Sequence, residues 1–136
     1  DVVKQLVESK NTANQFKSDL SKEDKKKYKD QVKASTEVVK EIDEIIAIFL
    51  GKVDRRQGIT RNPEVTVSQR FSSASRYVRS RFGNLTSTET QLIKQYKDAL
   101  NAAVKKSNDF FETQWTAYKS KVETISISPF KEIKKY

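Results

Sequence analysis

The sequence predicts an all-α protein, and three observations support this prediction. The 136 residues include only two prolines and three glycines, so the chain has few helix breakers and its elements should be long. Hydrophobic residues recur at spacings of three and four over several long stretches, as expected for helices with one buried face. Three of these stretches follow a Ser or Thr with an acid or amide three residues on, a helix-capping pattern. We therefore expect one four-helix bundle-like domain over residues 1–136.

The first two helices are predicted in the N-terminal part of the chain. The first spans Val2 to Asp19. The segment Ser21 to Asp24 is expected to cap the second helix, which follows an apolar stripe as far as Leu50. Gly51 then supplies the stop.

A long loop separates helices two and three. It runs from Lys52 to Val65, and its length of about fourteen residues exceeds the usual helix–helix connection. Thr66 to Gln69 forms a capping box before helix three, whose apolar stripe runs inward to Phe82. Thr86 to Glu89 caps helix four, which continues to about Glu123. The alternating residues 125–130 predict an extended C-terminal strap along the bundle.

The composition excludes several kinds of chemistry. The chain has no Cys and no His, which removes thiolate and imidazole catalysis, disulfides and the usual zinc sites. It lacks a glycine-rich phosphate loop, and no cofactor or metal is expected. Glu41 and Glu44 lie one turn apart on the outer side of helix two, where a solvated face is expected rather than an acid–base pair. No run approaches the ~18 apolar residues of a membrane helix. We therefore predict neither an enzyme nor a membrane span.

The positive charge is concentrated in one segment. The net charge is +9, and residues 52–83 hold all seven arginines plus Lys52 against two acids. Arginine in place of lysine favours bidentate or stacked contacts. This segment is therefore the first place to look for a binding surface.

The loop supplies the first group of candidate residues, Arg55, Arg56 and Arg61 with Asp54 and Asp43. Their guanidinium groups could satisfy carbonyls at the C-terminal end of helix two, where the helix dipole favours cations. We expect at least one of the three arginines to be buried and bonded to a carboxylate or carbonyl, with Asp43 and Asp54 the favoured acids. If all three are instead exposed and unpaired, the loop becomes a candidate binding site.

The second group is a basic flank of helix three, formed by Arg70, Tyr77 and Arg81 beside the apolar stripe. One hypothesis is structural, with Arg70 and Arg81 paired to acids of neighbouring helices. The other is that this flank docks onto the rest of a parent chain or binds an acidic ligand.

Several segments together resemble a known family. They are Gly51 to Pro63, Ser75 to Gly83, the aromatic run Phe110 to Trp115, and Ile127 to Phe130. They are similar to the C-terminal end of large bacterial proteins built on a sortilin-like β-propeller of Asp-box (BNR) repeats, often described as glycosyl hydrolases. The likeness covers most of the chain, best from residue 42 onward. It implies a helical C-terminal domain of a secreted or periplasmic protein, with any hydrolytic residues in the propeller.

The absence of Met and the helical pattern from Asp1 onward also lead us to expect a segment of a longer chain. The predicted function is a non-catalytic accessory or interaction domain, with the propeller or another protein as its partner. The alternative is a basic nucleic-acid-binding helical module. The inward stripe of helix three and the lack of a recognition motif argue against that alternative.

Overall fold

A computed structural model describes residues 1–23, 26–52, 65–80 and 82–125, and every regular element in them is a helix. These are α1 (Val2–Glu23), α2 (Lys29–Leu50), α3 (Val67–Arg79), α4 (Ser87–Phe110), the π-helical segment η1 (Phe111–Trp115) and α5 (Thr116–Glu123). The last three follow one another without a break and form a C-terminal rod, residues 87–123. The prediction of an all-α, four-helix bundle-like fold is confirmed, with the rod as its fourth helix.

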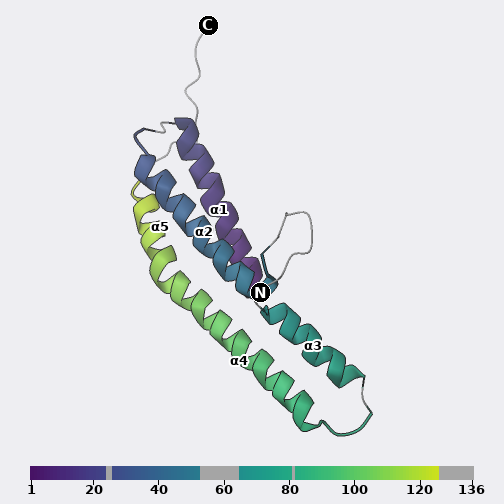
Figure 1. The fold of residues 1–136 in the computed structure, drawn as a ribbon. Helices are drawn as coiled ribbons and strands as arrows, with labels where there is room; N and C mark the ends of the chain where they lie inside the picture. Colours follow the sequence, from purple (N-terminus) through teal and green to yellow (C-terminus); the bar gives the residue numbers. More distant parts are fainter. Residues whose placement is uncertain (24–25, 53–64, 81, 126–136) are drawn as a thin grey trace.

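The rod runs along the whole molecule, and α2 and α3 pack against its two halves (Figure 1). Helix α2 contacts α4 and α5, and α1 packs antiparallel on α2, which gives a three-helix half. Helix α3 lies beyond the end of α2 and packs mainly against the first half of α4. We call this second part, residues 65–80 and 82–100, the α3–α4 hairpin.

The hydrophobic core lies in the three-helix half. Helix α1 contributes Leu6, Ala13 and Leu20, which are seven residues apart and fully buried. Helix α2 and the rod supply most of the remaining buried apolar side chains: Val38, Ile42, Ile45, Phe49, Ala103, Phe110 and Tyr118.

Two predicted capping boxes are confirmed. At the start of α3, the Gln69 N–H donates to Thr66 Oγ1 at 3.2 Å, and the Thr66 N–H donates to Gln69 Oε1 at 3.0 Å. At the start of α4, the Glu89 carboxylate accepts from the Thr86 N–H at 2.7 Å and from the Thr86 hydroxyl. Both boxes satisfy N–H groups that a helix leaves unpaired at its beginning.

Two predicted boundaries are wrong. The segment Ser21 to Asp24 does not cap α2, because α1 continues to Glu23 and α2 begins at Lys29. The Ser21 hydroxyl donates instead to the Lys17 carbonyl at 2.7 Å, a bond that serine makes inside helices. Helix α3 ends at Arg79 with Ser80 as its C-cap, before Phe82.

The rod contains a wide turn that was not predicted. Over η1 the backbone adopts the π-helical i→i+5 pattern, and the Thr116 hydroxyl donates to the Phe111 carbonyl at 2.9 Å. The rings of Phe110, Phe111, Trp115 and Tyr118 form an aromatic cluster around this turn, with neighbouring ring centroids 5.4 to 6.5 Å apart.

Most of the predicted loop and strap lie outside the described residues, at 53–64 and 126–136. In the part that is described, no helix is both long and apolar enough to cross a membrane.

Candidate functional site

The candidate loop residues Asp54, Arg55, Arg56 and Arg61 lie outside the described residues. The prediction that one of these arginines is buried and paired therefore stays a prediction.

Asp43, the other member of that group, joins α2 to α1. Its Oδ1 accepts from Lys10 Nζ at 2.6 Å. Both side chains keep contact with solvent, at 32% exposure for Lys10 and 51% for Asp43, so the pair adds at most about 1 kcal/mol. The partner that the structure gives Asp43 is thus a lysine of α1, where an arginine was expected.

The basic flank of α3 is only partly described. Arg70 Nη1 lies 3.5 Å from Gln95 Oε1 of α4, at the outer limit of a hydrogen bond. The structural hypothesis expected an acid as the partner of Arg70. Within the described part of the chain, the partner is the side-chain amide of Gln95. Tyr77 is about half exposed, and Arg81 falls outside the described residues.

The sequence predicts that the apolar stripe of α3 faces inward along its whole length. The structure shows that this prediction is wrong. Val67 and Ala74 are buried, but Phe71 is 52% and Val78 37% exposed, and Phe82 is completely exposed. The physical reason is that α3 packs mainly on α4, with only a smaller contact to α2. The Phe71 ring contacts the ring of Tyr96 in a tilted arrangement, with centroids 5.4 Å apart, and about half of its side chain stays exposed.

Exposed apolar side chains therefore gather on the α3–α4 hairpin. Eight large hydrophobic residues are exposed in the described part of the chain, and six belong to this hairpin. These six are Val65, Phe71, Tyr77, Val78, Phe82 and Leu85, which we call the hairpin patch. Clustered apolar exposure of this kind marks an interaction site more often than scattered exposed residues do.

The surroundings of the hairpin patch are basic. Helix α3 contains Arg70, Arg76 and Arg79 and no acid. Residues 65–100 hold six cationic residues against Glu89 and Asp98, and the Glu89 side chain is buried in its capping box. Arg76 and Arg79 are exposed and form no ion pair with any described residue. The hairpin thus combines apolar side chains with unpaired positive charge.

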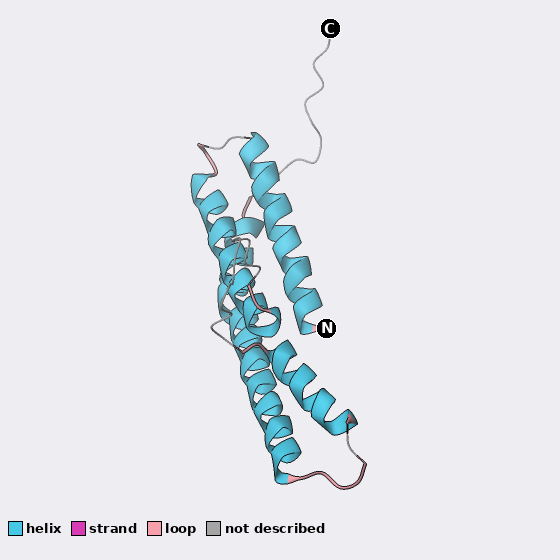
Figure 2. Ribbon diagram, turned by 45° about the vertical axis from the view of Figure 1, so that its right-hand side comes forward, coloured by secondary structure: helices cyan, strands magenta, loops and turns pink. Residues whose placement is uncertain are grey.

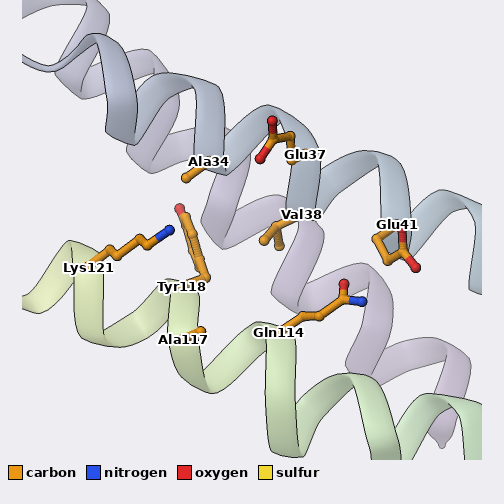
Figure 3. A pocket seen from close by; sticks show the side chains of 8 residues that line it. All are labelled: Ala34, Glu37, Val38, Glu41, Gln114, Ala117, Tyr118 and Lys121. Atoms are coloured by element: carbon orange, nitrogen blue, oxygen red, sulfur yellow. The ribbon is translucent and has the colours of Figure 1, made fainter.

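A groove between α2 and the C-terminal part of the rod is the other candidate (Figure 3). It has a volume of about 280 Å³ and includes Glu37, Glu41, Tyr118 and Lys121 in its lining. The Tyr118 hydroxyl is hydrogen-bonded to the Ser35 hydroxyl at 2.9 Å, and burial raises the pKa of Tyr118 although this hydrogen bond opposes it. Glu37 lies 3.9 Å from Lys33, on the exposed surface.

This groove offers no nucleophile with an adjacent base, since its tyrosine hydroxyl is already bonded and its two carboxylates belong to an open helix face. Among the described residues, no group of three acidic, Cys or His side chains could hold a metal ion. The hairpin patch is therefore the better candidate site. Of this patch, only Tyr77 is a candidate from the sequence, because the spacing of Phe71, Val78 and Phe82 predicts a core stripe.

Comparisons with known proteins add no relative. No protein-family model, no curated protein and no solved structure matches the chain.

Proposed function

We propose that this chain is a non-catalytic interaction domain that docks onto a larger body through its α3–α4 hairpin. The hairpin patch is the observation that supports this proposal most directly. Burying one large apolar side chain is worth roughly 1.5–3 kcal/mol, and six such side chains lie exposed on one short hairpin. A partner that covered them would gain part of this free energy, because five of the six are 37–61% exposed and only Phe82 is completely exposed. The three-helix half already has its own core.

The resemblance to sortilin-like Asp-box proteins suggests what that larger body is. On this proposal the domain belongs to a secreted or periplasmic chain and docks onto its β-propeller or onto another protein. Determining whether the natural protein extends before Asp1, and with what sequence, tests this part. Asp-box repeats would support it, and a DNA-processing domain would replace it with the nucleic-acid alternative.

The positive charge of the hairpin is the only observation that supports the nucleic-acid alternative. Arg76 and Arg79 could contact phosphates, as could other cations of the hairpin. Phosphate contacts, however, give no role to exposed side chains such as Phe82 and Leu85. We therefore keep protein docking as the conclusion.

Anisotropy titration of labelled duplex DNA and RNA with the chain at physiological salt separates the two functions. We expect weak binding without sequence preference, near the 10⁻⁴ to 10⁻⁶ M typical of non-specific contacts. An Arg76→Glu, Arg79→Glu variant should weaken it further. Nanomolar affinity for either nucleic acid would overturn the docking proposal.

A further inference from the structure

We infer that the end of the α3–α4 hairpin binds the surface of a lipid bilayer that contains anionic lipids. This end consists of the last turn of α3, the connection that follows and the first two residues of α4 (residues 76–80 and 82–88), and we call it the hairpin tip. The inference goes beyond the proposed docking function, because it gives the tip a partner of its own. It follows from the position of the tip, its exposed apolar side chains and its charge.

The hairpin tip forms one end of the molecule. The connection between α3 and α4 lies at this end in both views, away from the three-helix half (Figures 1 and 2). Gly83 in the connection has a φ of +114°, and a Cβ atom added to it would meet nothing within 4 Å. The middle of the connection therefore stands clear of the rest of the described chain, and a flat surface can approach it end-on.

Two apolar side chains belong to this connection. Phe82 is completely exposed, the largest exposed fraction of any large hydrophobic residue in the described part of the chain, and Leu85 is 52% exposed. Phenylalanine and leucine are typical of the side chains that peripheral proteins bury at the boundary between lipid headgroups and acyl chains. A lipid surface would thus take up the two side chains that the fold leaves in water at this end.

The charge of the tip favours anionic lipids. Arg76 and Arg79 are exposed in the last turn of α3 and form no ion pair with any described residue. The sequence adds Arg81, which lies outside the described residues, and residues 65–88 contain no acid. The next acid along the chain, Glu89, is buried in its capping box. Cations beside a membrane surface are attracted by negatively charged headgroups.

An anionic bilayer uses both features of the tip together. Membrane binding through few apolar groups is weak and becomes stable when positive charge supports it. A nucleic acid would engage the arginines and leave Phe82 and Leu85 in water. A second copy of this chain would bring one acid-free tip against another, at a net charge of +9 on each chain.

Flotation of lipid vesicles with the 136-residue chain tests the inference. One set of vesicles contains phosphatidylcholine alone, and the other replaces about a third of it with phosphatidylserine. We expect the apparent affinity for the anionic vesicles to be at least about tenfold higher. Raising the salt concentration should weaken this binding, because it screens the contacts of the arginines.

Variants of the apolar pair separate insertion from simple attraction, since a net charge of +9 draws the chain to any anionic surface. Phe82→Ser with Leu85→Ser should lower the affinity for anionic vesicles by at least about tenfold. Val7→Ser is the matched control, because Val7 is 39% exposed on α1, and it should leave the affinity unchanged. Circular dichroism and unfolding curves establish that each variant remains folded.

A second pair of variants locates the charge. Arg76→Glu with Arg79→Glu should abolish the preference for anionic vesicles. The same charge change at Lys105 and Lys106, both exposed in α4, should preserve it.

A label reports directly whether the tip enters the bilayer. The chain has no Cys, so one introduced cysteine carries an environment-sensitive fluorophore at a single place. Asn84→Cys keeps both apolar side chains of the tip, and Asn11→Cys on α1 is the control at another exposed asparagine. With anionic vesicles, emission from position 84 should shift to the blue and be quenched by lipids that carry a nitroxide on the acyl chain. Emission from position 11 should do neither.

Several outcomes would overturn the inference. They are equal affinity for the two kinds of vesicle, unchanged affinity of the Phe82→Ser, Leu85→Ser variant, or unchanged emission of the label at position 84. Absence of binding to either kind of vesicle would also overturn it and would leave the tip to the protein partner of the proposed function. That function has its own test in the nucleic-acid titration, so the two can fail separately.

Discussion

The contact between Ser35 and Tyr118 joins α2 to the rod through two buried hydroxyl groups. Ser35 Oγ donates to the Gln31 carbonyl at 2.9 Å, and it lies 2.9 Å from the Tyr118 hydroxyl. Because a serine hydroxyl has one proton, the tyrosine is the donor in the second bond. Both side chains are buried, so the bond fixes the rod against α2 with little exposure to solvent.

Replacing Tyr118 by Phe should therefore lower the free energy of unfolding by about 1 kcal/mol, because Ser35 keeps its bond to Gln31. Urea unfolding at neutral pH measures this change. Ser35→Ala, which leaves the buried tyrosine hydroxyl without its acceptor, should cost at least as much. A stability equal to that of the parent chain in both variants would show that the bond contributes nothing.

The raised pKa of Tyr118 adds a dependence on pH. Since the folded chain holds this proton more tightly than the unfolded chain, the contribution is complete below about pH 10 and decreases as the pH rises through the folded-state value. The parent chain should thus lose more stability than Tyr118→Phe as the pH rises above about 10. Unfolding curves across this range, with Tyr77→Phe as the exposed control, test the expectation.

Which side chains pair with one another across helices was the feature least predictable from the sequence. Lys10 and Asp43 are 33 residues apart in the chain. Nothing in their sequence neighbourhoods distinguishes this lysine from the nineteen others. Their pairing follows from the rotation of α1 against α2, which many helix sequences would permit.

Helix α3 shows what local sequence does determine. Its capping box was predictable because the residues involved, Thr66 and Gln69, lie three positions apart and need no tertiary contact. Thr66→Ala and Gln69→Ala should each cost on the order of 1 kcal/mol, while Thr66→Ser keeps the acceptor oxygen and should cost much less. Chemical denaturation compares the three, and equal losses for Ser and Ala at position 66 would contradict the role of the cap.

The π-helical turn could not be predicted in the same way, because it depends on packing. In a regular helix, Phe110 and Tyr118 would point about 80° apart. The wide turn takes up an additional residue, and both side chains are buried, at 3% and 5% exposure. The turn thus keeps the aromatic cluster on the core side of the rod.

Deleting the exposed Glu112 should convert η1 to regular α-helix. The residues after it should then keep the same side facing the core. We expect this deletion to change the free energy of unfolding by less than about 1 kcal/mol. Deleting the exposed Lys106, in the regular part of α4, rotates everything beyond it by about 100° and should unfold the three-helix half. Helical content and unfolding midpoints distinguish the two deletions; equal damage from both would contradict this account.

At the scale of the whole molecule, the sequence predicted the helices but not how far each reaches along the bundle. Val67, Phe71, Ala74 and Val78 are spaced as a core stripe, and the prediction that all face inward assumed neighbours on that side. In the structure only Val67 and Ala74 are covered by neighbouring side chains and buried. The hairpin patch depends on where α1 and α2 end relative to α3, which no periodicity encodes.

This unequal packing should appear in amide hydrogen exchange. The apolar burial that opposes local opening is concentrated in the three-helix half. Amides of α3 and of the first turns of α4 should therefore exchange faster than those in the middle of α2 and in the second half of α4. Mass-spectrometric exchange on the free chain measures this gradient, and uniform protection along the rod would contradict it.

The aromatic cluster has one practical consequence. Trp115 is the only tryptophan in the chain, and its ring lies 5.4 Å from Tyr118 and 6.5 Å from Phe110. Its fluorescence therefore reports on the three-helix half, whereas the far-ultraviolet circular dichroism signal sums over both halves. If the hairpin unfolds first, the dichroism signal will fall before the emission changes, and the separation of the two curves will measure how independently it melts.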